Sequence, residues 1–556
     1  MEQFTEEEKQ LLLPFVSNLD KPVFVLRNLP EVVKGALFSR YSRSTKSLRR
    51  TLLDEFIKNK EIGFNATDAI SIVGGFEGAI ANPQERVWQS KLFGNLDIAT
   101  EKAEAFYDRV LLGYGDDSVA ELAGAHIALE DISIIATKVV EDARLGLSPL
   151  EKSTRYVYFD QKDENGKWRY YEEPDLINSE FASLYRETCD HLFATYASLI
   201  PKISRYVTEK MPEQERKGLS ERAMEATVRA KTCDIIRGLL PASTKTNMGF
   251  FGNGRAYEYL ITRMYADPLA EMRGLAKEMQ DELRTVIPSF VKRPDTELGL
   301  IWQKYMKETR LDGEVAGISP EPQADDVMLV EYDQNAEDRI IASALYPYSK
   351  TSFETLLQDA KQMTQDQRDK IISTYVGKRG NRRHKPGRAF ELPQYSFDIC
   401  ANFGCYRDIH RHRVLTQQRQ LLGCIHGYTL PKEIVESGHE SEFKDAMNAA
   451  KNAWEKISNK HPIQAQYVVP LAFRIRWQMV LSLREAFHFC ELRSARQGHI
   501  DYRRIAQQMF KEIEKVHPNF AKQMIFMDMN EYEFERLEAE KAQDQRMAVI
   551  FGKKGD

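Results

Sequence analysis

The sequence predicts a helix-rich α+β fold that occurs twice in one chain. The segment at 36–43, Ala-Leu-Phe-Ser-Arg-Tyr-Ser-Arg, recurs at 344–350 as Ala-Leu-Tyr-Pro-Tyr-Ser-Lys, and the Leu-Pro pair at 240–241 recurs as Val-Pro at 469–470. Such internal repetition indicates that one structural unit has been duplicated. A chain of 556 residues has room for two cores of roughly 200 to 280 residues each.

Helices dominate the predicted elements of both copies. Apolar residues recur at a spacing of three and four, the period of an amphipathic helix, in five segments: 101–113, 119–145, 222–239, 255–264 and 269–287. Two shorter runs rich in aromatic and β-branched residues, 156–159 and 395–399, are expected to be strands or strand ends. The combination gives the α+β class.

The two copies differ in length. Copy one is expected at 20–295 with insertions near 60–100 and 157–220, and a linker rich in proline and glycine follows at 296–330. Copy two is expected at 331–535. The remaining residues, 536–556, are charged and are expected to form a solvated helix and a frayed tail.

Composition excludes several functional classes. The net charge is −5 with both signs interspersed, which disfavours binding to a nucleic-acid backbone or to an anionic membrane. No run approaches eighteen apolar residues. Six cysteines without CxxC spacing, and an amino terminus without signal-peptide features, favour a reducing cytoplasm. The Gly-rich stretch at 74–78 lacks the Gly-Lys-Ser/Thr of a phosphate loop, so a flexible loop is expected there.

The first chemical motif is Arg411-His412-Arg413. Guanidinium groups at this density suit a phosphate or carboxylate, because each can donate two parallel hydrogen bonds to an oxyanion. A solvated basic face is the alternative for the triplet alone. Metal binding is disfavoured, because His410 and His412 are two residues apart and no acidic or cysteine partner stands at ligand spacing.

The second motif is Ser148-x-x-Glu151-x-Ser153-x-Arg155-Tyr156. It offers hydroxyl, carboxylate and guanidinium groups within nine residues. A helix cap is an equally good local explanation, with Ser148 as N-cap and Glu151 completing a capping box.

Together the two motifs resemble the signature of the flavin-dependent thymidylate synthases, Arg-His-Arg-x-x-Ser-x-Asn-Glu-x-Ser-x-Arg-Tyr. Copy two matches its first half, and copy one matches its second half with Glu151, Ser153 and Arg155. Other positions also resemble family segments: Ser118, Glu121, Asn253, Arg255 and Arg263 in copy one, and Arg476 and Arg493 in copy two. The resemblance implies two tandem copies of that family's fold.

The departures from the signature are nearly complementary. Copy one has Asp142-Ala143-Arg144 where Arg-His-Arg is expected, and copy two lacks the second half of the signature at 416–423. Asp116 stands near a family histidine, and Asp408 replaces a glutamine; a carboxylate there would repel phosphate unless Arg407 or Arg411 paired with it. In the family the site forms between subunits of a homotetramer. We therefore hypothesise a homodimer that acts as a pseudo-tetramer with composite sites.

The resemblance implies reductive methylation of dUMP to dTMP, with FAD as cofactor and NADPH and methylenetetrahydrofolate as co-substrates. It implies catalytic roles for Arg263, Arg493 and Ser153. It implies cofactor binding by Ser118, Glu121, Asn253, Arg255, Arg411, His412 and Arg413, and no metal. It implies substrate binding by Glu151, Ser153, Arg155, Arg411, Arg476 and Arg493. The alternatives are a flavoenzyme of this fold with another substrate, such as a halogenase or a modified-pyrimidine methylase, and a non-catalytic nucleotide-binding relative.

Overall fold

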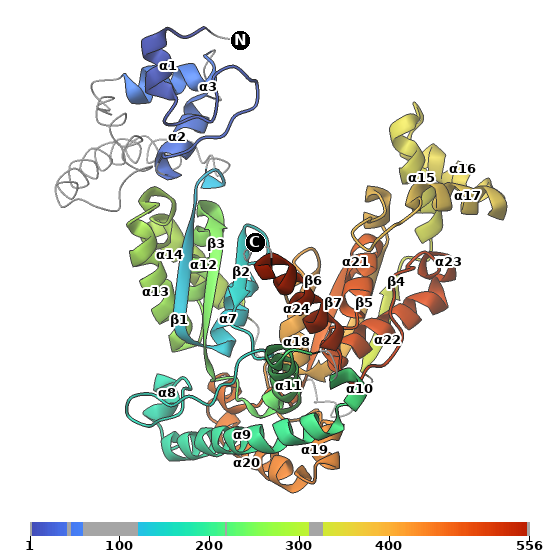
Figure 1. Ribbon diagram of the computed structural model, residues 1–556. Coiled ribbons are helices and arrows are strands. Elements are labelled where there is room, and N and C mark those ends of the chain that lie inside the picture. Colours follow the sequence, from blue (N-terminus) through green and yellow to red (C-terminus); the bar gives the residue numbers. More distant parts are fainter. Residues whose placement is uncertain are drawn as a thin grey trace. The chain divides into compact units, whose positions relative to one another are not determined.

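The computed structural model (Figure 1) describes residues 3–29, 31–41, 46–58, 120–216, 219–310 and 326–552. The chain folds into two compact units that are discontinuous in sequence. The first unit comprises Met1–Leu129, Asp142–Leu150 and Met248–Asp312, and the second comprises Glu130–Glu141, Glu151–Asn247 and Gly313–Asp556. Several predictions fall outside the described residues: the helix at 101–113, the loop at 74–78, the insertion at 60–100, Asp116 and Ser118.

The first unit holds the amino-terminal helices, most of a three-stranded sheet, and a helical layer. Its strand order is β1-β3-β2, and the unit boundary falls within these strands. The elements are α1 (Glu6–Leu12), α2 (Glu31–Tyr41), α3 (Leu48–Thr51), η1 (Leu52–Ile57), β1 (Gly124–Ser133), β2 (Leu147–Glu151), β3 (Lys245–Asn253), α12 (Gly254–Tyr265), α13 (Ala270–Arg284), η4 (Pro288–Phe290), η5 (Arg293–Asp295) and α14 (Glu297–Glu308).

The second unit contains helices of copy one and the whole described part of copy two. From copy one come α7 (Ile134–Glu141), α8 (Pro174–Ile177), α9 (Ala182–Lys210), α10 (Glu213–Arg216), α11 (Glu221–Ile236) and η3 (Arg237–Leu239). From copy two come β4 (Val327–Tyr332), α15 (Ala336–Leu345), η6 (Tyr346–Tyr348), α16 (Phe353–Gln362), α17 (Gln365–Val376), η7 (Arg388–Glu391), β5 (Gln394–Asn402), α18 (Phe403–Ile409), β6 (Thr416–Arg419), α19 (Lys432–Glu436), α20 (Glu440–Ser458), η8 (Gln464–Val468), β7 (Arg474–Ser482), α21 (Leu483–Arg493), α22 (Ile500–Val516), α23 (Pro518–Ala521) and α24 (Leu537–Gly552).

The order of elements confirms the α+β class and the duplication. Copy one runs β1-α7-β2 and later β3-α12-α13, and copy two runs β5-α18-β6 and later β7-α21-α22. The sheets agree as well, because β1-β3-β2 in one corresponds to β5-β7-β6 in the other. Copy two carries β4 as an additional edge strand, antiparallel to β5. The same topology has therefore formed twice.

The copies meet inside the second unit through their repeated proline motifs. Pro241 and Pro470 form an isolated antiparallel bridge. Around it Ala242 N donates to Val469 O, and Leu471 N donates to Leu240 O, both at 2.9 Å. The long helices α9 and α20 also pack against one another. The two copies of one chain therefore pair with each other locally, as related halves.

Most of the predicted helices and one of the two predicted strands are confirmed. Elements α11 with η3, α12 and α13 cover the periodic segments predicted between 222 and 287, and β5 covers 395–399. The helix predicted at 119–145 is wrong over its first part, where β1 runs from Gly124 to Ser133. The apolar residues of that segment suit either period, and pairing in the sheet decided between them. The segment 156–159 was predicted as a strand and contains none.

The stretches expected as linker (296–330) and charged tail (536–556) both contain helices, α14 and α24. Helix α14 begins at the Thr296 cap inside the stretch expected as linker, and Leu537 at the start of α24 is fully buried. Among the described residues, no helix combines the length and apolarity needed to cross a membrane.

Candidate active site

A buried cluster of five ionisable side chains joins the two copies. Lys138 and Glu141 lie one turn apart on α7, and Arg407 lies on the corresponding helix α18, one turn before His410, the C-cap of that helix. The fifth member is Glu151, at the end of β2. Arg407 Nη2 lies 2.5 Å and Lys138 Nζ 3.1 Å from the Glu151 carboxylate, His410 Nδ1 lies 3.3 Å from Glu141, and Lys138 also binds Glu141. All five side chains are buried.

The electrostatics of this cluster keep its carboxylates ionised. Burial alone would raise the pKa of Glu141, but Lys138 and His410 lower it to about 2. Burial likewise opposes ionisation of Glu151, but Arg407 and Lys138 hold its pKa below the ordinary value. Glu151, which the resemblance assigns to the substrate, is thus committed to an internal ion cluster. The cluster fastens the copies together.

Arg155 and Arg493, predicted site residues from different copies, converge on one aromatic ring. The guanidinium of Arg155 lies 5.4 Å from the centre of the Tyr502 ring, and that of Arg493 lies 5.3 Å from it. Arg155 Nη1 also donates to the Tyr502 hydroxyl at 2.9 Å. Its Nε and Nη2 donate to the two oxygens of Asp234 at 2.8 and 2.7 Å. Burial would lower the pKa of Arg155, but Asp234 raises it well above its ordinary value.

Arg237 is a candidate site residue that the sequence interpretation missed. It follows α11, is 4% exposed, and donates to Asp408 at 2.9 Å through Nη1. Its Nη2 is buried and has no hydrogen-bond partner among the described residues. Burial opposes the charge of Asp408, yet Arg237 and Arg155 lower the pKa of that carboxyl strongly. The anticipated partner of Asp408 was Arg407 or Arg411, and it is Arg237 instead.

His412 lies in a hydrogen-bonded relay. Its Nε2 accepts from Arg493 Nε at 2.9 Å, so the neutral ring carries its proton on Nδ1, which is 2.9 Å from Glu485 Oε1. Burial, and then the charge of Arg493, lowers the pKa of His412 well below its ordinary value. Burial raises the pKa of Glu485 to about 7.

The same relay contains a potential set of metal ligands. Atoms of His412, Glu485 and His488 that could bind a metal lie within 4.8 Å of one another. The neighbouring cations Arg493 and Lys385 lower the pKa of both histidines after burial, and the same positive charges disfavour a metal ion. We therefore interpret the group as a relay that holds Arg493.

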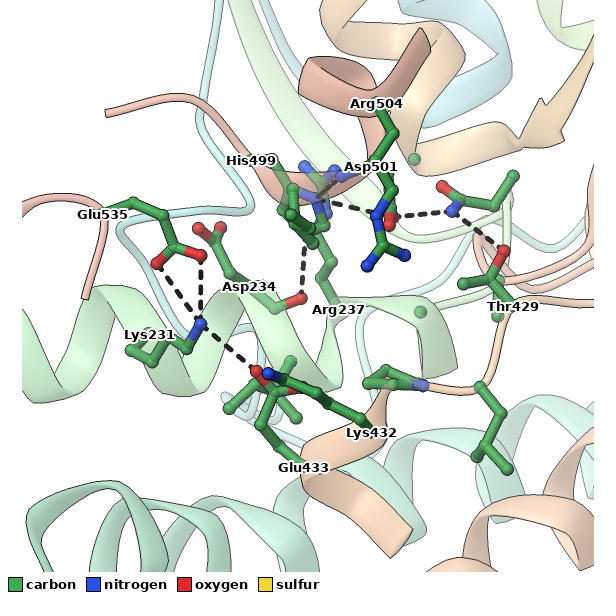
Figure 2. Close-up of a pocket in the computed structure, with 18 of the residues that line it drawn as sticks. Lys231, Asp234, Arg237, Thr429, Lys432, Glu433, His499, Asp501, Arg504 and Glu535 are labelled. Carbon is green, nitrogen blue, oxygen red and sulfur yellow. Dashed lines mark hydrogen bonds and ion pairs between the residues drawn. The ribbon is translucent and has the colours of Figure 1, made fainter. Parts of the chain in front are cut away.

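A cavity of about 440 Å³ adjoins Arg237 and Asp234 (Figure 2). Its wall is mixed in charge. Lys231 lies between Glu433 and Glu535, at 3.2 and 3.1 Å. His499 Nε2 lies 3.2 Å from the Asp234 carbonyl oxygen. The cavity thus has a polar floor, with the unused Arg237 donor among its lining residues.

Comparison with known proteins agrees with the duplication, because one family model matches the chain twice. The model of the family described as thymidylate synthase complementing protein matches residues 79–289 and again residues 328–519. The chain belongs to this family. Among relatives of the whole chain, proteins named UPF0159 from Chlamydia pneumoniae and Chlamydia muridarum are 42% and 41% identical; each alignment covers 97% of this chain and 98% of the relative. A UPF0159 protein of Thermoplasma acidophilum is 32% identical over 79% of this chain and 92% of its own length.

A relative with a named activity is more distant. The flavin-dependent thymidylate synthase of Clostridium tetani is 24% identical over 35% of this chain and 85% of its own length. A crystal structure of a UMP/dUMP methylase from Streptomyces cacaoi aligns with 37% of this chain and 97% of its own, at 16% identity and a TM-score of 0.28.

Other predicted site residues of this family member in the second unit have varied surroundings. Arg411 and Arg413 are exposed. Arg476, on β7, lies 3.7 Å from Asp398. Ser153 Oγ accepts a local hydrogen bond from Arg155 N at 3.1 Å. Arg411 is therefore accessible to a ligand, whereas the Ser153 hydroxyl already takes part in a turn.

The remaining predicted residues belong to the first unit. Glu121 and Arg255 form an exposed ion pair at 2.7 Å. Asn253 caps α12 by accepting from Ala256 N at 2.9 Å, and Arg263 is half-buried on the same helix. Their roles toward a cofactor stay a prediction.

Proposed function

We propose that the chain is a flavin-dependent enzyme that reductively methylates dUMP to dTMP at a composite site built from both copies of one chain. The carrying observation is the convergence of Arg155 from copy one and Arg493 from copy two on Tyr502. Membership of the family and the named activity of the Clostridium tetani relative support the choice of reaction.

The charge of the site suits a phosphate monoester. Four arginines, Arg155, Arg237, Arg411 and Arg493, surround two aspartates, Asp234 and Asp408; the charge of Arg411 acts on both Asp408 and Arg493. Over these six side chains the cations outnumber the carboxylates by two, and Arg536 beside Asp234 adds a further positive charge, so the site has an excess of positive charge for a phosphate dianion. Guanidinium forks bind such oxyanions through paired hydrogen bonds. The same charges would stabilise negative charge that develops on a pyrimidine ring.

The flavin called for by this proposal fits part of the predicted residue set. Exposed Arg411 and Arg413 can bind its diphosphate, whereas His412 cannot without losing its bonds to Arg493 or Glu485. When bound, the flavin supplies the hydride, which NADPH restores, and methylenetetrahydrofolate supplies the carbon. The residues of the chain bind the nucleotide, orient it and neutralise its charge. We further propose that two chains assemble as a pseudo-tetramer.

One observation favours a second candidate, a flavoenzyme of this fold with another substrate. Asp234 occupies two nitrogens of Arg155, and Asp408 occupies one of Arg237. Because these carboxylates already bind the arginines, the site suits a ligand that needs fewer of the arginine donors than a phosphate does. Flavin binding without turnover of dUMP would favour this candidate.

The decisive experiment measures flavin absorbance of the purified protein and then, anaerobically, tritium release from dUMP labelled at C5, with methylenetetrahydrofolate and NADPH. Wild type is compared with Arg155→Ala, Arg411→Ala and, as control, Lys304→Ala, a change at an exposed residue of α14. We expect each arginine variant to lose on the order of 100-fold in kcat/KM, about 2.7 kcal/mol of transition-state stabilisation. A loss of less than about tenfold in kcat/KM in either variant would refute the composite site.

A further inference from the structure

The C-terminal segment Phe534–Leu537 docks beside Arg155, and it lies outside both stretches that the family model matches. Phe534 and Leu537 are buried, and Glu535 binds Lys231 of α11 at 3.1 Å. Arg536 Nη1 donates to the backbone oxygen of Arg155 at 3.2 Å. An element with no counterpart in the matched domain therefore contacts the candidate site.

The guanidinium of Arg536 is buried without using all of its donors. The residue is 7% exposed, and its guanidinium lies 4.1 Å from the centre of the Tyr156 ring. Its Nε and Nη2 have no hydrogen-bond partner among the described residues. Nη2 lies 3.6 Å from Asp234 Oδ2, which is close enough for an ion pair and too far for a hydrogen bond. Buried donors normally have partners, so these two point to an arrangement that forms in another state.

The Nε and Nη2 fork of Arg155 is not available to a phosphate as it stands, and three of the five N–H donors are engaged. Asp234 holds its Nε and Nη2, and Tyr502 holds its Nη1. Turning Arg155 toward a ligand would leave the Asp234 carboxylate, whose side chain is 12% exposed, without its main partner. A buried charge that loses its partner is strongly unfavourable. Asp234 therefore needs a second cation if Arg155 is to leave.

We propose that Arg536 is a positioning residue that forms an ion pair with Asp234 in place of Arg155 when Arg155 turns to the phosphate of the nucleotide. This inference rests on the proposed nucleotide-binding function. A void of about 10 Å³, lined by Asp234, Phe534 and Arg536 among others, leaves room for about one water molecule. Arg536 can close the remaining gap through this space. Asp234 then has an arginine partner both with and without the nucleotide. The C-terminal segment thereby releases Arg155 to bind the phosphate.

A double-mutant cycle on the full chain tests the exchange. The dissociation constant of dUMP is measured by calorimetry for wild type, Arg536→Gln, Asp234→Asn and the double variant. We expect Arg536→Gln to weaken binding about tenfold in the wild-type background and less than twofold in the Asp234→Asn background, because a neutral amide at position 234 no longer retains Arg155. Lys541→Gln, on helix α24 that begins directly after Arg536, is the control; among the described residues Lys541 pairs only locally, with Glu538.

Two results would overturn the exchange alone: no effect of Arg536→Gln, or an equal loss in both backgrounds, which would mean direct contact or a merely structural role. If Asp234→Asn fails to fold, Arg536→Lys decides, because lysine keeps a cation for Asp234. We then expect near wild-type binding for Arg536→Lys and a tenfold loss for Arg536→Gln, and equal losses would contradict the proposal. Wild-type protein that binds neither dUMP nor inorganic phosphate would overturn the proposed function, and this inference with it.

Discussion

The corresponding helices α7 and α18 show what each copy has kept. At the end of each lies a buried pair of ionisable side chains one turn apart, Lys138 with Glu141 and Arg407 with the C-cap His410, and these pairs meet. The residues that follow differ. After α7 the chain continues Asp142-Ala143-Arg144, and after α18 it continues Arg411-His412-Arg413. The helices that join the copies remain alike, whereas the cations beyond them remain complete only in copy two.

The opposite asymmetry occurs four residues before the proline of the shared motif. Copy one has Arg237 there, paired with Asp408 and with a donor left over. Copy two has Gln466, whose amide accepts from Leu422 N at 3.0 Å and donates to Ile463 O at 2.9 Å. In copy one this position forms an ion pair, whereas in copy two it makes hydrogen bonds to the backbone. The difference supports the proposal that the two copies supply complementary halves of one site.

The largest expected effect concerns the buried cluster that joins the copies. Arg407→Leu leaves Glu151 buried with Lys138 as its remaining cation. We expect the free energy of unfolding to fall by about 3 to 5 kcal/mol, as for other buried ion pairs that lose one partner. Chemical denaturation measures it, with exposed Lys304→Leu as control. A loss below about 1 kcal/mol would mean that the cluster does not fasten the copies together.

The buried Glu485 beside His412 in copy two predicts that the free energy of unfolding depends on pH. Glu485→Gln should remove this dependence. Burial raises the pKa of Glu485 from 4.5 to about 7. The folded state therefore binds more protons than the unfolded state between these values. The resulting stability is fully present below pH 4.5 and is lost as the pH rises through 7. We expect this group to contribute a fall of up to about 3 kcal/mol in unfolding free energy across that window.

Unfolding curves at several pH values between 4 and 8 measure this dependence. Glu455→Gln, exposed on α20, serves as the control and should leave the slope unchanged. An unaltered slope in Glu485→Gln would show that Glu485 is ionised throughout the window.

The next largest effect is expected at Arg411, which follows α18, in contrast to Asp142, the corresponding residue after α7. Arg411→Ala should weaken dUMP binding about tenfold, roughly 1.4 kcal/mol, because it removes one charge from the phosphate site. Asp142→Ala changes the matching position of copy one and should leave binding within twofold. Calorimetric titration of both variants measures the difference. Similar effects from the two changes would contradict the division of roles between the copies.

The smallest effect is expected at Tyr502, which bridges Arg155 and Arg493. Tyr502 is the third residue of α22, and the third residue of α13 in copy one is Met272. Tyr502→Phe keeps the ring and removes the hydroxyl that Arg155 binds, so we expect a loss of about 1 kcal/mol in nucleotide binding. Tyr502→Met, which copies the residue of copy one, should cost more because both ring contacts disappear. Equal nucleotide binding by Tyr502→Phe and Tyr502→Met would mean that the aromatic ring does not contribute to the site.

The sequence was sufficient for the duplication and for most helices, because these depend on local patterns; the pairing of site halves from different copies stays a prediction. The sequence was not sufficient for β3 and β7, whose mixed residues become strands only by pairing, nor for the first part of 119–145. Arg237 and Arg536 were missed because neither lies in a signature. Their roles depend on carboxylates 171 and 302 residues away, at Asp408 and Asp234, and only the fold brings those groups together.

The central claim is that one chain holds both halves of one site, and it is tested most directly by placing the two lesions in the same chain or in different chains. Arg155→Ala and Arg411→Ala chains are co-expressed and compared with co-expressed wild-type and doubly substituted chains, using dUMP binding and tritium release. The account predicts activity reduced on the order of 100-fold in the first pair, as in the single variants, and retained activity from the wild-type chains of the second. Substantial activity from the first pair would show that the site forms between chains, and would contradict the account.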